Sequence, residues 1–133
     1  HDNHERMCHL RAKKVQSIAD FFPEIEPDGP ATGELLVLSW GGTYGAVSSA
    51  VHRVQERGQS VAHVHLRHLN PFPKNLEEVL SGYRNVLIPE LNLGQLALVI
   101  RGRFLVDVFS YARVEGRPFT ISEIERRIEE LLS

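Results

Sequence analysis

Apolar residues follow two alternating patterns along most of the chain. Mainly apolar runs occupy 34–40, 61–66 and 85–89, and the first of them is nearly continuous, which is typical of a strand that is covered on both faces of a parallel sheet. The residues between the first two runs carry apolar side chains at helical spacing, and Gly58 ends that helix. We therefore predict strands that alternate with helices, as in a parallel sheet with helices on both faces.

Capping residues locate further helices. Asn75 and Glu78 predict a capping box at the start of a short helix, and Thr120 and Glu123 predict one for the last helix. The helix before the last is followed by a fourth expected strand, at 104–109. The pattern thus predicts a sheet whose strands are connected by helices throughout.

The N-terminal part of the chain has a different pattern. Residues 1–22 show an irregular helical stripe and are interpreted as a leading helix, and 23–133 as a single α/β domain. The proline- and glycine-rich segment 23–33 follows that helix and has room for a short edge strand at 24–26. Because the chain opens at His1 instead of a methionine, we expect it to be a fragment of a longer subunit.

Composition narrows the class of protein. The 133 residues are 42% hydrophobic and 24% charged, with a formal net charge of -2, which is the balance of an ordinary globular domain. Fifteen Lys and Arg residues against seventeen Asp and Glu residues give no positive field for nucleic acid. No apolar run approaches the length that crosses a membrane, and the single cysteine, Cys8, fits a cytoplasmic location.

The glycine-rich turn after the first apolar run is one candidate site. Gly41, Gly42, Thr43 and Tyr44 stand between a strand and a helix, where backbone N–H groups and the positive helix end can bind a phosphate or carboxylate. The turn lacks the Lys-Ser/Thr ending of a P-loop and the spacing of a dinucleotide-binding turn. A tight turn with Thr43 as helix cap is the favoured interpretation, and an anion site is the alternative.

The histidines form a second candidate site. His63 and His65 alternate along a strand and so face the same way, and His68 follows in the loop. Three imidazoles can bind zinc, but hydrogen-bonded histidines are the favoured interpretation because no Cys or carboxylate stands beside them. A group near the chain start that includes His4 and Cys8 is a weaker metal candidate. We assign no metal site, and no serine lies in a GxSxG elbow that would make it a nucleophile.

Polar residues after the third apolar run form a third candidate site. Asn92 and Gln95 match a capping box of Asn-x-x-Gln form. Glu90 lies beside the positive end of the same helix. Helix capping is therefore a sufficient explanation of all three residues, although ligands in open parallel sheets favour the same strand ends.

The helix that follows these residues is apolar on every side, because 96–100 are all apolar and consecutive. A helix of this kind must be covered twice, once by its own sheet and once by another surface. We therefore expect Leu98 and Val99 to lie in an interface with a second domain or subunit.

Five stretches together resemble one known family. They are, in order, LLVLSWGGTYG, VAHVHLRHLNPFP, VLIPELNLGQL, FLVDVFSY and VEGRPFTISEIE. Their order, with the PFP element at 71–73 and the E-x-N-x-G-Q element at 90–95, resembles the C-terminal domain of the alpha subunit of 2-oxoacid:ferredoxin oxidoreductases. The 2-oxoglutarate enzymes are the most similar, and with NHERMCHLRAKKV at the start the resemblance covers nearly the whole chain.

The resemblance implies both a fold and an activity of the full enzyme. The fold is a three-layer α/β/α fold like the transketolase C-terminal domain, with a mostly parallel sheet of about five strands and an antiparallel edge strand from the proline-rich segment. The family's enzymes oxidatively decarboxylate a 2-oxoacid with thiamine diphosphate and Mg. They pass electrons through an iron–sulfur cluster to ferredoxin and load the acyl group onto coenzyme A.

The reacting groups of that family belong to parts of the enzyme other than this segment. The resemblance therefore implies no catalytic residue and no cofactor that this chain binds alone. We expect a structural and assembly domain that contacts the rest of the alpha subunit and the beta subunit. The alternative is a free-standing α/β module that binds an anionic small molecule at the carboxyl ends of the strands.

Overall fold

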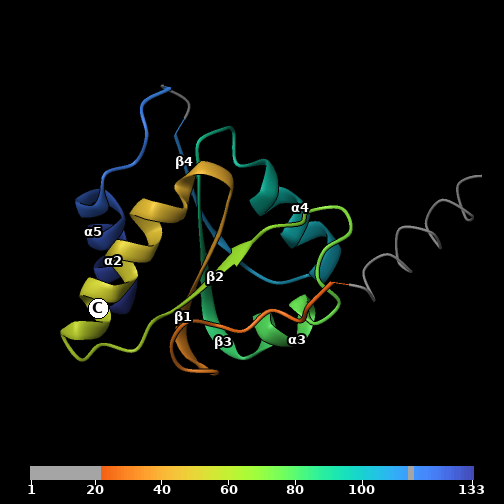
Figure 1. The fold of residues 1–133 in the computed structure, drawn as a ribbon, viewed down its shortest axis with the longest axis horizontal. Helices are drawn as coiled ribbons and strands as arrows, with labels where there is room; N and C mark the ends of the chain where they lie inside the picture. Colours follow the sequence, from red (N-terminus) through yellow and green to blue (C-terminus); the bar gives the residue numbers. More distant parts are fainter. Residues whose placement is uncertain (1–21, 114–115) are drawn as a thin grey trace, which may run out of the picture.

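The computed structural model describes residues 22–113 and 116–133, so the expected leading helix and the metal candidate near the chain start lie outside the described residues. The elements are β1 (Gly33–Trp40), the 3₁₀ turn η1 (Gly41–Thr43), α2 (Tyr44–Glu56), β2 (Ala62–Leu66), α3 (Leu76–Ser81), β3 (Tyr83–Glu90), α4 (Gln95–Phe104), β4 (Phe109–Ala112) and α5 (Ile121–Leu132) (Figure 1).

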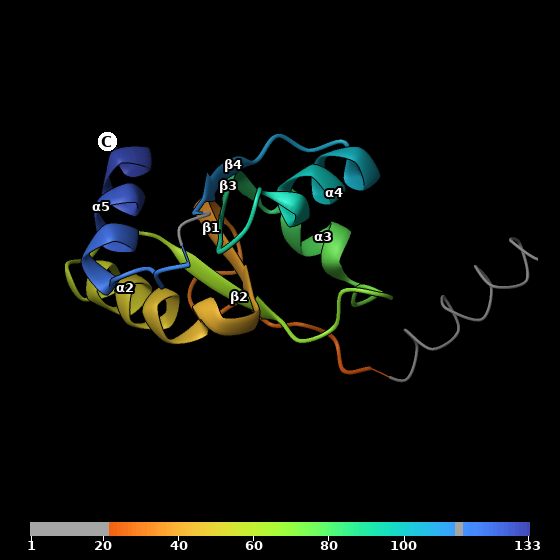
Figure 2. The ribbon, with the colours of Figure 1, turned by 90° about the horizontal axis from the view of Figure 1, so that it is seen from above.

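The four strands form a parallel sheet in the order β2-β1-β3-β4. Helices α2 and α5 cover one face of this sheet, and α3 and α4 cover the other (Figure 2). Continuous apolar strands predict this double cover, since each face of the sheet must be buried. The three-layer α/β/α architecture is therefore confirmed.

Each face of the sheet packs its own apolar core. Leu36 and Leu38 of β1 face α3 and α4, whereas Leu35 and Val37 face α2 and α5, because successive strand residues point to opposite faces. The apolar stripe predicted for the helix between the first two apolar runs is the buried side of α2. Ile124 of α5 packs in the same core. The two cores meet only through the sheet.

The expected fifth strand is reduced to one antiparallel bridge. Asp28 and His63 exchange backbone hydrogen bonds of 2.8 and 3.0 Å at the outer side of β2. The segment 24–26, which was expected to pair, is held instead through Asn75, whose side chain accepts a hydrogen bond from the Ile25 N–H at 3.0 Å and donates one to its carbonyl at 2.9 Å. The described sheet thus has four strands.

This use of the Asn75 side chain also overturns its predicted capping box. Asn75 occupies the N-cap position of α3, but its side chain makes no hydrogen bond to that helix. The capping box of α5 is confirmed, because Thr120 accepts from the Glu123 N–H at 3.2 Å and Glu123 accepts from the Thr120 N–H at 3.1 Å.

The fourth strand lies later in the chain than the sequence predicts. Helix α4 continues through Phe104, where the ring packs 5.8 Å from that of Phe72. The residue that follows, Leu105, has a left-handed backbone with φ of 55° and terminates the helix. The predicted strand at 104–109 is therefore wrong, since tertiary packing extends the helix and leaves only Phe109 to the true strand.

Candidate functional site

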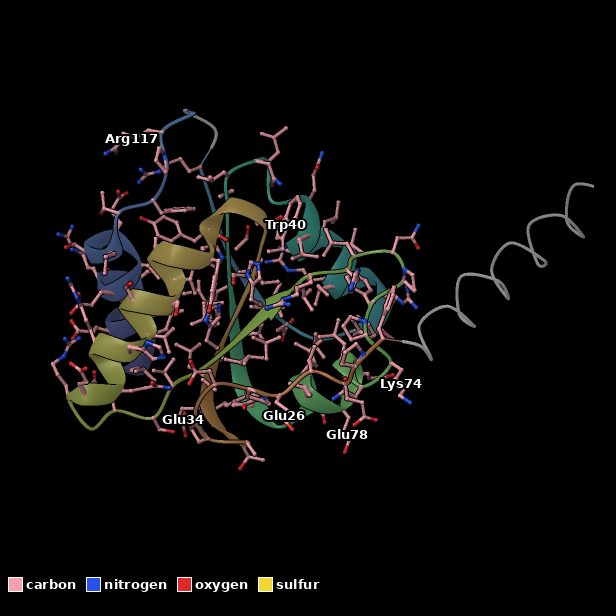
Figure 3. The ribbon with its side chains drawn as sticks, viewed as in Figure 1. Glu26, Glu34, Trp40, Lys74, Glu78 and Arg117 are labelled. Carbon is pink, nitrogen blue, oxygen red and sulfur yellow. The ribbon has the colours of Figure 1, made fainter. Side chains whose placement is uncertain are left out.

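The carboxyl ends of β1 and β3 lie side by side because the two strands are parallel neighbours. This edge is where open parallel sheets bind ligands. The loops that leave it are η1 and the segment 91–94, which lead into α2 and α4. Trp40, the last residue of β1, lies on this side of the molecule, and Glu34 near its start lies toward the opposite end (Figure 3).

Glu90 is the central polar residue of this edge, and only 1% of it is exposed. Its carboxylate accepts hydrogen bonds from the backbone N–H groups of Leu96 at 2.8 Å and Ala97 at 3.1 Å. It also accepts one from the indole Nε1 of Trp40 at 3.2 Å. A buried carboxylate is stabilised by such donors and by the positive end of a helix. Glu90 therefore joins β1, β3 and α4, and both of its carboxylate oxygens accept hydrogen bonds inside the fold.

Asn92 completes the start of α4. Its Oδ1 accepts from the N–H groups of Gly94 at 2.8 Å and Gln95 at 3.3 Å. The N-cap residue itself is Gly94, whose left-handed φ of 79° suits glycine, so the predicted Asn-x-x-Gln box is wrong in its geometry. Asn92 and Glu90 together satisfy the free N–H groups of the first turn of α4, and these groups are not available to an anion.

The glycine-rich turn forms the other half of the edge. Gly41 has a left-handed φ of 63° and opens the 3₁₀ turn η1. Thr43 donates its hydroxyl to the Trp40 carbonyl at 2.9 Å and does not cap α2, which corrects the predicted cap. The turn, including Gly42, lines a hollow of about 110 Å³ together with Asn92.

The structure thus brings the glycine-rich turn and the polar residues after β3 together at one hollow. The volume of this hollow limits the ligands that it can hold. Small-molecule sites usually enclose about 300–1,000 Å³, which is well above this volume. Tyr44, the last candidate of the turn, points elsewhere and stacks on histidines of β2. The hollow does not have the size of a cofactor site.

The β2 histidines form a compact polar cluster around a buried serine. Ser39 Oγ lies 2.7 Å from Nε2 of His63 and 2.8 Å from Nδ1 of His65. The Tyr44 ring covers both imidazoles, with centroid distances of 5.9 and 4.9 Å. One hydroxyl can donate to one imidazole and accept from the other, so the three groups satisfy one another.

Burial keeps these imidazoles neutral. It lowers the pKa of His63 from 6.5 to about 4, and the neighbouring His65 lowers it further while Asp28 opposes the change. Burial also lowers the pKa of His65, with a contribution from Arg67. The side chains of the cluster are therefore matched as neutral hydrogen-bonding partners.

Sequence reasoning identified the shared face of the two histidines but missed Ser39. The signal was available in the strand register, since Ser39 lies opposite His65 once β1 and β2 are neighbours. The third histidine does not join them, because His68 stacks on Phe22 at 3.9 Å. Within residues 22–113 and 116–133, no group of His, Cys, Asp and Glu side chains has the arrangement of a metal site.

Helix α4 has one buried side and one apolar exposed side. Leu96, Ala97 and Ile100 pack on the sheet, whereas Leu98 is 70% exposed and Val99 is 49% exposed. Isolated exposed leucines are common, whereas contiguous exposed apolar residues mark interaction sites more often. The remaining candidate, Gln95, lies at the start of this helix.

A mostly apolar hollow of about 170 Å³ adjoins that exposed side. It is lined by Trp40, Leu69, Phe72, Gln95, Leu96 and Val99. We call Leu98, Val99 and this hollow the α4 face. The indole of Trp40 thus contributes to the α4 face with its ring and to the Glu90 network with its N–H. Among the described helices, none combines the length and apolar character that a membrane span requires.

Comparisons with known proteins agree with this architecture. The family model of pyruvate:ferredoxin oxidoreductase core domain II matches residues 33–124. The 2-oxoglutarate oxidoreductase subunit KorA of Mycobacterium tuberculosis is 49% identical over 132 residues, which cover 98% of this chain and 20% of that subunit. The chain thus spans about a fifth of the length of this relative.

Solved structures show the same relationship. A 2-oxoglutarate:ferredoxin oxidoreductase from Magnetococcus marinus, with 2-oxoglutarate, coenzyme A and succinyl-CoA bound, matches 99% of this chain and 24% of its own chain, at 30% identity and a TM-score of 0.89. A split-gene transketolase matches 80% of this chain and 39% of its own, at 16% identity and a TM-score of 0.61, which concerns the fold alone. The expected transketolase-like fold is therefore confirmed.

Proposed function

Because the chain belongs to the family of pyruvate:ferredoxin oxidoreductase core domain II, we propose that it is a structural and assembly domain of the alpha subunit of such an enzyme. The full enzyme would be a thiamine-diphosphate-dependent 2-oxoacid:ferredoxin oxidoreductase. The similarity to KorA of M. tuberculosis supports 2-oxoglutarate as the substrate and succinyl-CoA as the product. We place the domain at the C-terminal end of that subunit and the enzyme in the cytoplasm.

The observation that carries the proposal is the exposed apolar side of α4. Leu98 is 70% exposed although it lies in the middle of an apolar helix. Burying one leucine side chain against a partner contributes about 2 kcal/mol. The α4 face is therefore the surface on which we expect the rest of the alpha subunit or the beta subunit to pack.

The cofactors of such an enzyme do not fit the described residues. The hollow at Gly41 measures about 110 Å³, which is small for a diphosphate with its metal ion. The N–H groups at the start of α4 are occupied by Glu90 and Asn92. The described residues also contain no cysteine, whereas iron–sulfur clusters are held by cysteine thiolates. Thiamine diphosphate, Mg and the cluster would therefore be held by other parts of the full enzyme.

Ferredoxin and coenzyme A are partners of the full enzyme in this proposal. The bound coenzyme A in the M. marinus structure belongs to that protein, and the present chain covers 24% of it. The expected contacts of this chain are the neighbouring domain and the beta subunit, since its polar strand-end residues are used inside the fold.

The test is to replace Leu98 by aspartate in the full alpha subunit and to co-express it with the beta subunit. The new charge cannot be buried without a partner, so association should weaken by about thirtyfold, the equivalent of about 2 kcal/mol. Size-exclusion chromatography with light scattering measures the assembly, and 2-oxoglutarate oxidation should fall in proportion. In the 133-residue chain the same change should leave the melting temperature within about 2 °C, because Leu98 is exposed there.

Leu105→Asp is the matched control. Leu105 is 89% exposed at the end of the same helix, and its left-handed backbone tolerates aspartate. It lies beyond the last residue of α4 and outside the α4 face as defined above. Equal assembly by the two variants would contradict the proposed role of the α4 face.

The alternative of a free-standing anion-binding module predicts a different result. Phosphate, coenzyme A or Mg with thiamine diphosphate would raise the melting temperature of the 133-residue chain, because a ligand specific for the folded state stabilises it. We expect no change with any of these compounds. A rise that is lost on mutation of Gly41 to valine would support the alternative instead.

A further inference from the structure

The proline- and glycine-rich segment 23–33 is fixed to the domain, although its composition is that of a linker. The side chain of Asn75 accepts a hydrogen bond from the Ile25 N–H at 3.0 Å and donates one to the Ile25 carbonyl at 2.9 Å. Farther along, Asp28 and His63 exchange their two backbone hydrogen bonds. Backbone groups that are paired in this way hold a segment in one conformation. We call 23–33 the connector, and it is a fixed part of the domain.

The described chain enters the domain beside the α4 face. The Phe22 ring stacks on that of His68 with a centroid distance of 3.9 Å. Leu69, the next residue, lines the hollow of the α4 face, and consecutive Cα atoms are about 3.8 Å apart. Both ribbon views place this end of the described chain on the side of α3 and α4, away from α2 and α5 (Figure 1, Figure 2). Polypeptide that precedes Phe22 is therefore attached close to the α4 face.

A tethered partner has an advantage over a free one at this face. The 21 residues before Phe22 span at most about 75 Å even when fully extended, so polypeptide upstream of this chain is held near α4. The tether makes its contact with α4 intramolecular, and the effective concentration for short linkers reaches the millimolar range. A separate subunit instead loses its translational and rotational freedom on binding. The entry point of the chain therefore favours an occupant from the same polypeptide.

The hollow of the α4 face suits a single apolar side chain. It encloses about 170 Å³, and an apolar cavity of roughly 150 Å³ accommodates a group the size of benzene. Its walls include Trp40, Phe72 and Val99. We therefore expect the occupant to insert one aromatic or branched aliphatic side chain here, and to cover the exposed Leu98 with the surface around it.

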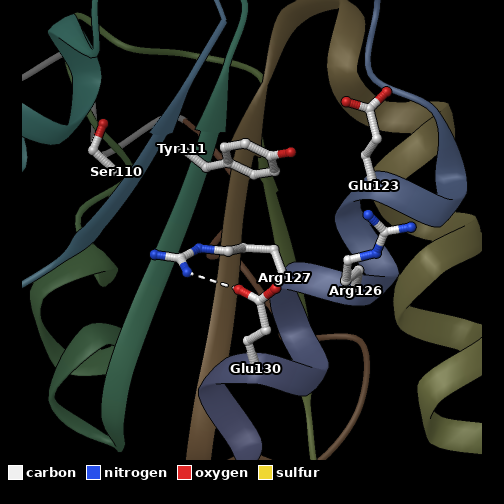
Figure 4. A pocket seen from close by; sticks show the side chains of 6 residues that line it. All are labelled: Ser110, Tyr111, Glu123, Arg126, Arg127 and Glu130. Carbon is white, nitrogen blue, oxygen red and sulfur yellow. Dashed lines mark hydrogen bonds and ion pairs between the residues drawn. The ribbon is translucent and has the colours of Figure 1, made fainter.

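The larger hollow between β4 and α5 has a different character. It encloses about 380 Å³ and is lined by Ser110, Tyr111, Glu123, Arg126, Arg127 and Glu130 (Figure 4). Glu130 pairs with Arg127 at 3.0 Å, and Glu123 accepts a hydrogen bond from Arg113 at 3.1 Å. Both carboxylates thus have arginine partners within the fold, and no aliphatic side chain of the described residues lines this hollow. An apolar partner is therefore expected at α4 and not between β4 and α5.

We propose that the α4 face is covered by the part of the same alpha subunit that precedes this chain, and not by the beta subunit. This inference rests on the proposed function, and it names which of the two neighbours packs on α4. The chain spans about a fifth of the length of its M. tuberculosis relative, so a subunit of that size has ample polypeptide outside these residues. The connector fixes the orientation in which that polypeptide meets α4, and Asn75 positions the connector.

The test is a photo-crosslinker in the complete enzyme, with the alpha and beta subunits co-expressed. The photoreactive amino acid p-benzoylphenylalanine takes the place of Leu98, and mass spectrometry identifies the crosslinked peptides after irradiation. We expect adducts that join α4 to alpha-subunit peptides upstream of this chain. The same group in place of Gln95, whose side chain lines the hollow, should give the same peptides and decides the question if the first variant does not assemble. A third variant carries the group at Leu105, outside the α4 face, and should give few adducts.

A second measurement tests the connector. Asn75→Ala removes the partner of the Ile25 N–H and should speed amide hydrogen exchange of Ile25 in the 133-residue chain about tenfold, the equivalent of one lost hydrogen bond. In the complete enzyme the same variant should spread the adducts of the Leu98 position over more upstream peptides. Ser81→Ala is the matched control, because the Ser81 hydroxyl donates to the Glu78 carbonyl within α3. It should change neither result.

The crosslinked species distinguish the possible occupants. Adducts between alpha and beta chains would overturn the inference and leave the proposed function intact, and adducts between two alpha chains would do the same. An assembled and active enzyme in which the positions of Leu98 and Gln95 give no more adducts than that of Leu105 would refute both the inference and the proposed role of the α4 face. Unchanged exchange of Ile25 in Asn75→Ala would show that Asn75 does not position the connector.

Discussion

Replacing Glu90 by glutamine tests whether this residue serves the fold. The side chain is 1% exposed and accepts from two backbone N–H groups and the Trp40 indole. Glutamine has nearly the same shape but only one acceptor oxygen, and its amide N–H₂ must face one of the donors. The oxygen that now accepts from Trp40 and Leu96 can be kept, so the Ala97 N–H would lose its partner.

The size of the effect follows from these contacts. An unsatisfied buried donor costs about 1–3 kcal/mol, and loss of the charge at the helix start costs about 0.3–1 kcal/mol more. We expect Glu90→Gln to lower the free energy of unfolding by about 2–3 kcal/mol. Glu90→Leu leaves all three donors unsatisfied and should cost more, about 4 kcal/mol, which is a large part of the stability of a typical domain.

The assay is urea unfolding of the 133-residue chain, followed by circular dichroism and Trp40 fluorescence. Coincident curves would justify a two-state analysis. Glu34→Gln is the matched control, because Glu34 is exposed and only 3.8 Å from Arg84 in a loose surface pair. It should change stability by less than about 0.5 kcal/mol. If Glu90→Gln is equally mild, the hydrogen bonds of Glu90 do not hold the fold and the structural explanation fails.

Two further predictions concern other parts of the fold. The pKa of His63 is lowered to about 4 in the folded chain. In the unfolded chain the exposed imidazole has its ordinary pKa of 6.5, so it binds a proton at a higher pH than in the fold. The chain should therefore lose about 3 kcal/mol of stability as the pH falls from 6.5 to 4, and urea unfolding of His63→Gln should show a flatter profile over this range. Thr120→Ala removes the cap of α5 and should cost about 1 kcal/mol, measured by thermal unfolding. Ser122→Ala, an exposed change in the first turn, is its control and should change little.

The sequence predicts the layers of this fold better than its edges. Three strands and the helices α2 and α5 follow from the apolar runs and stripes, because each is long and its periodicity is clear. The apolar residues of 104–109 suit a helix or a strand equally well, and only the packing of Phe104 on Phe72 keeps Phe104 in α4. Local patterns do not contain that contact.

The candidate site was predicted as a set of residues but not as a geometry. The helix-start role of Glu90 and Asn92 was expected, whereas the donor from Trp40 was not, because it depends on the pairing of β1 with β3. Ser39 was missed for the same reason, since it meets the histidines through the register of β1 and β2. Residue patterns along the chain do not predict contacts between strands that are far apart in sequence.

The polar residues at the end of β3 fix the position of the helix that carries the exposed apolar side chains. Glu90 holds the N–H groups of Leu96 and Ala97, the residues that directly precede Leu98 and Val99. A loose α4 would have to be ordered again when a partner packs on it, and that ordering would reduce affinity. Glu90→Gln should therefore weaken both folding and assembly, while Leu98→Asp weakens assembly alone. This difference separates a carboxylate that orients an interface from one that reacts with a substrate, since a reacting carboxylate would affect turnover in a fully assembled enzyme.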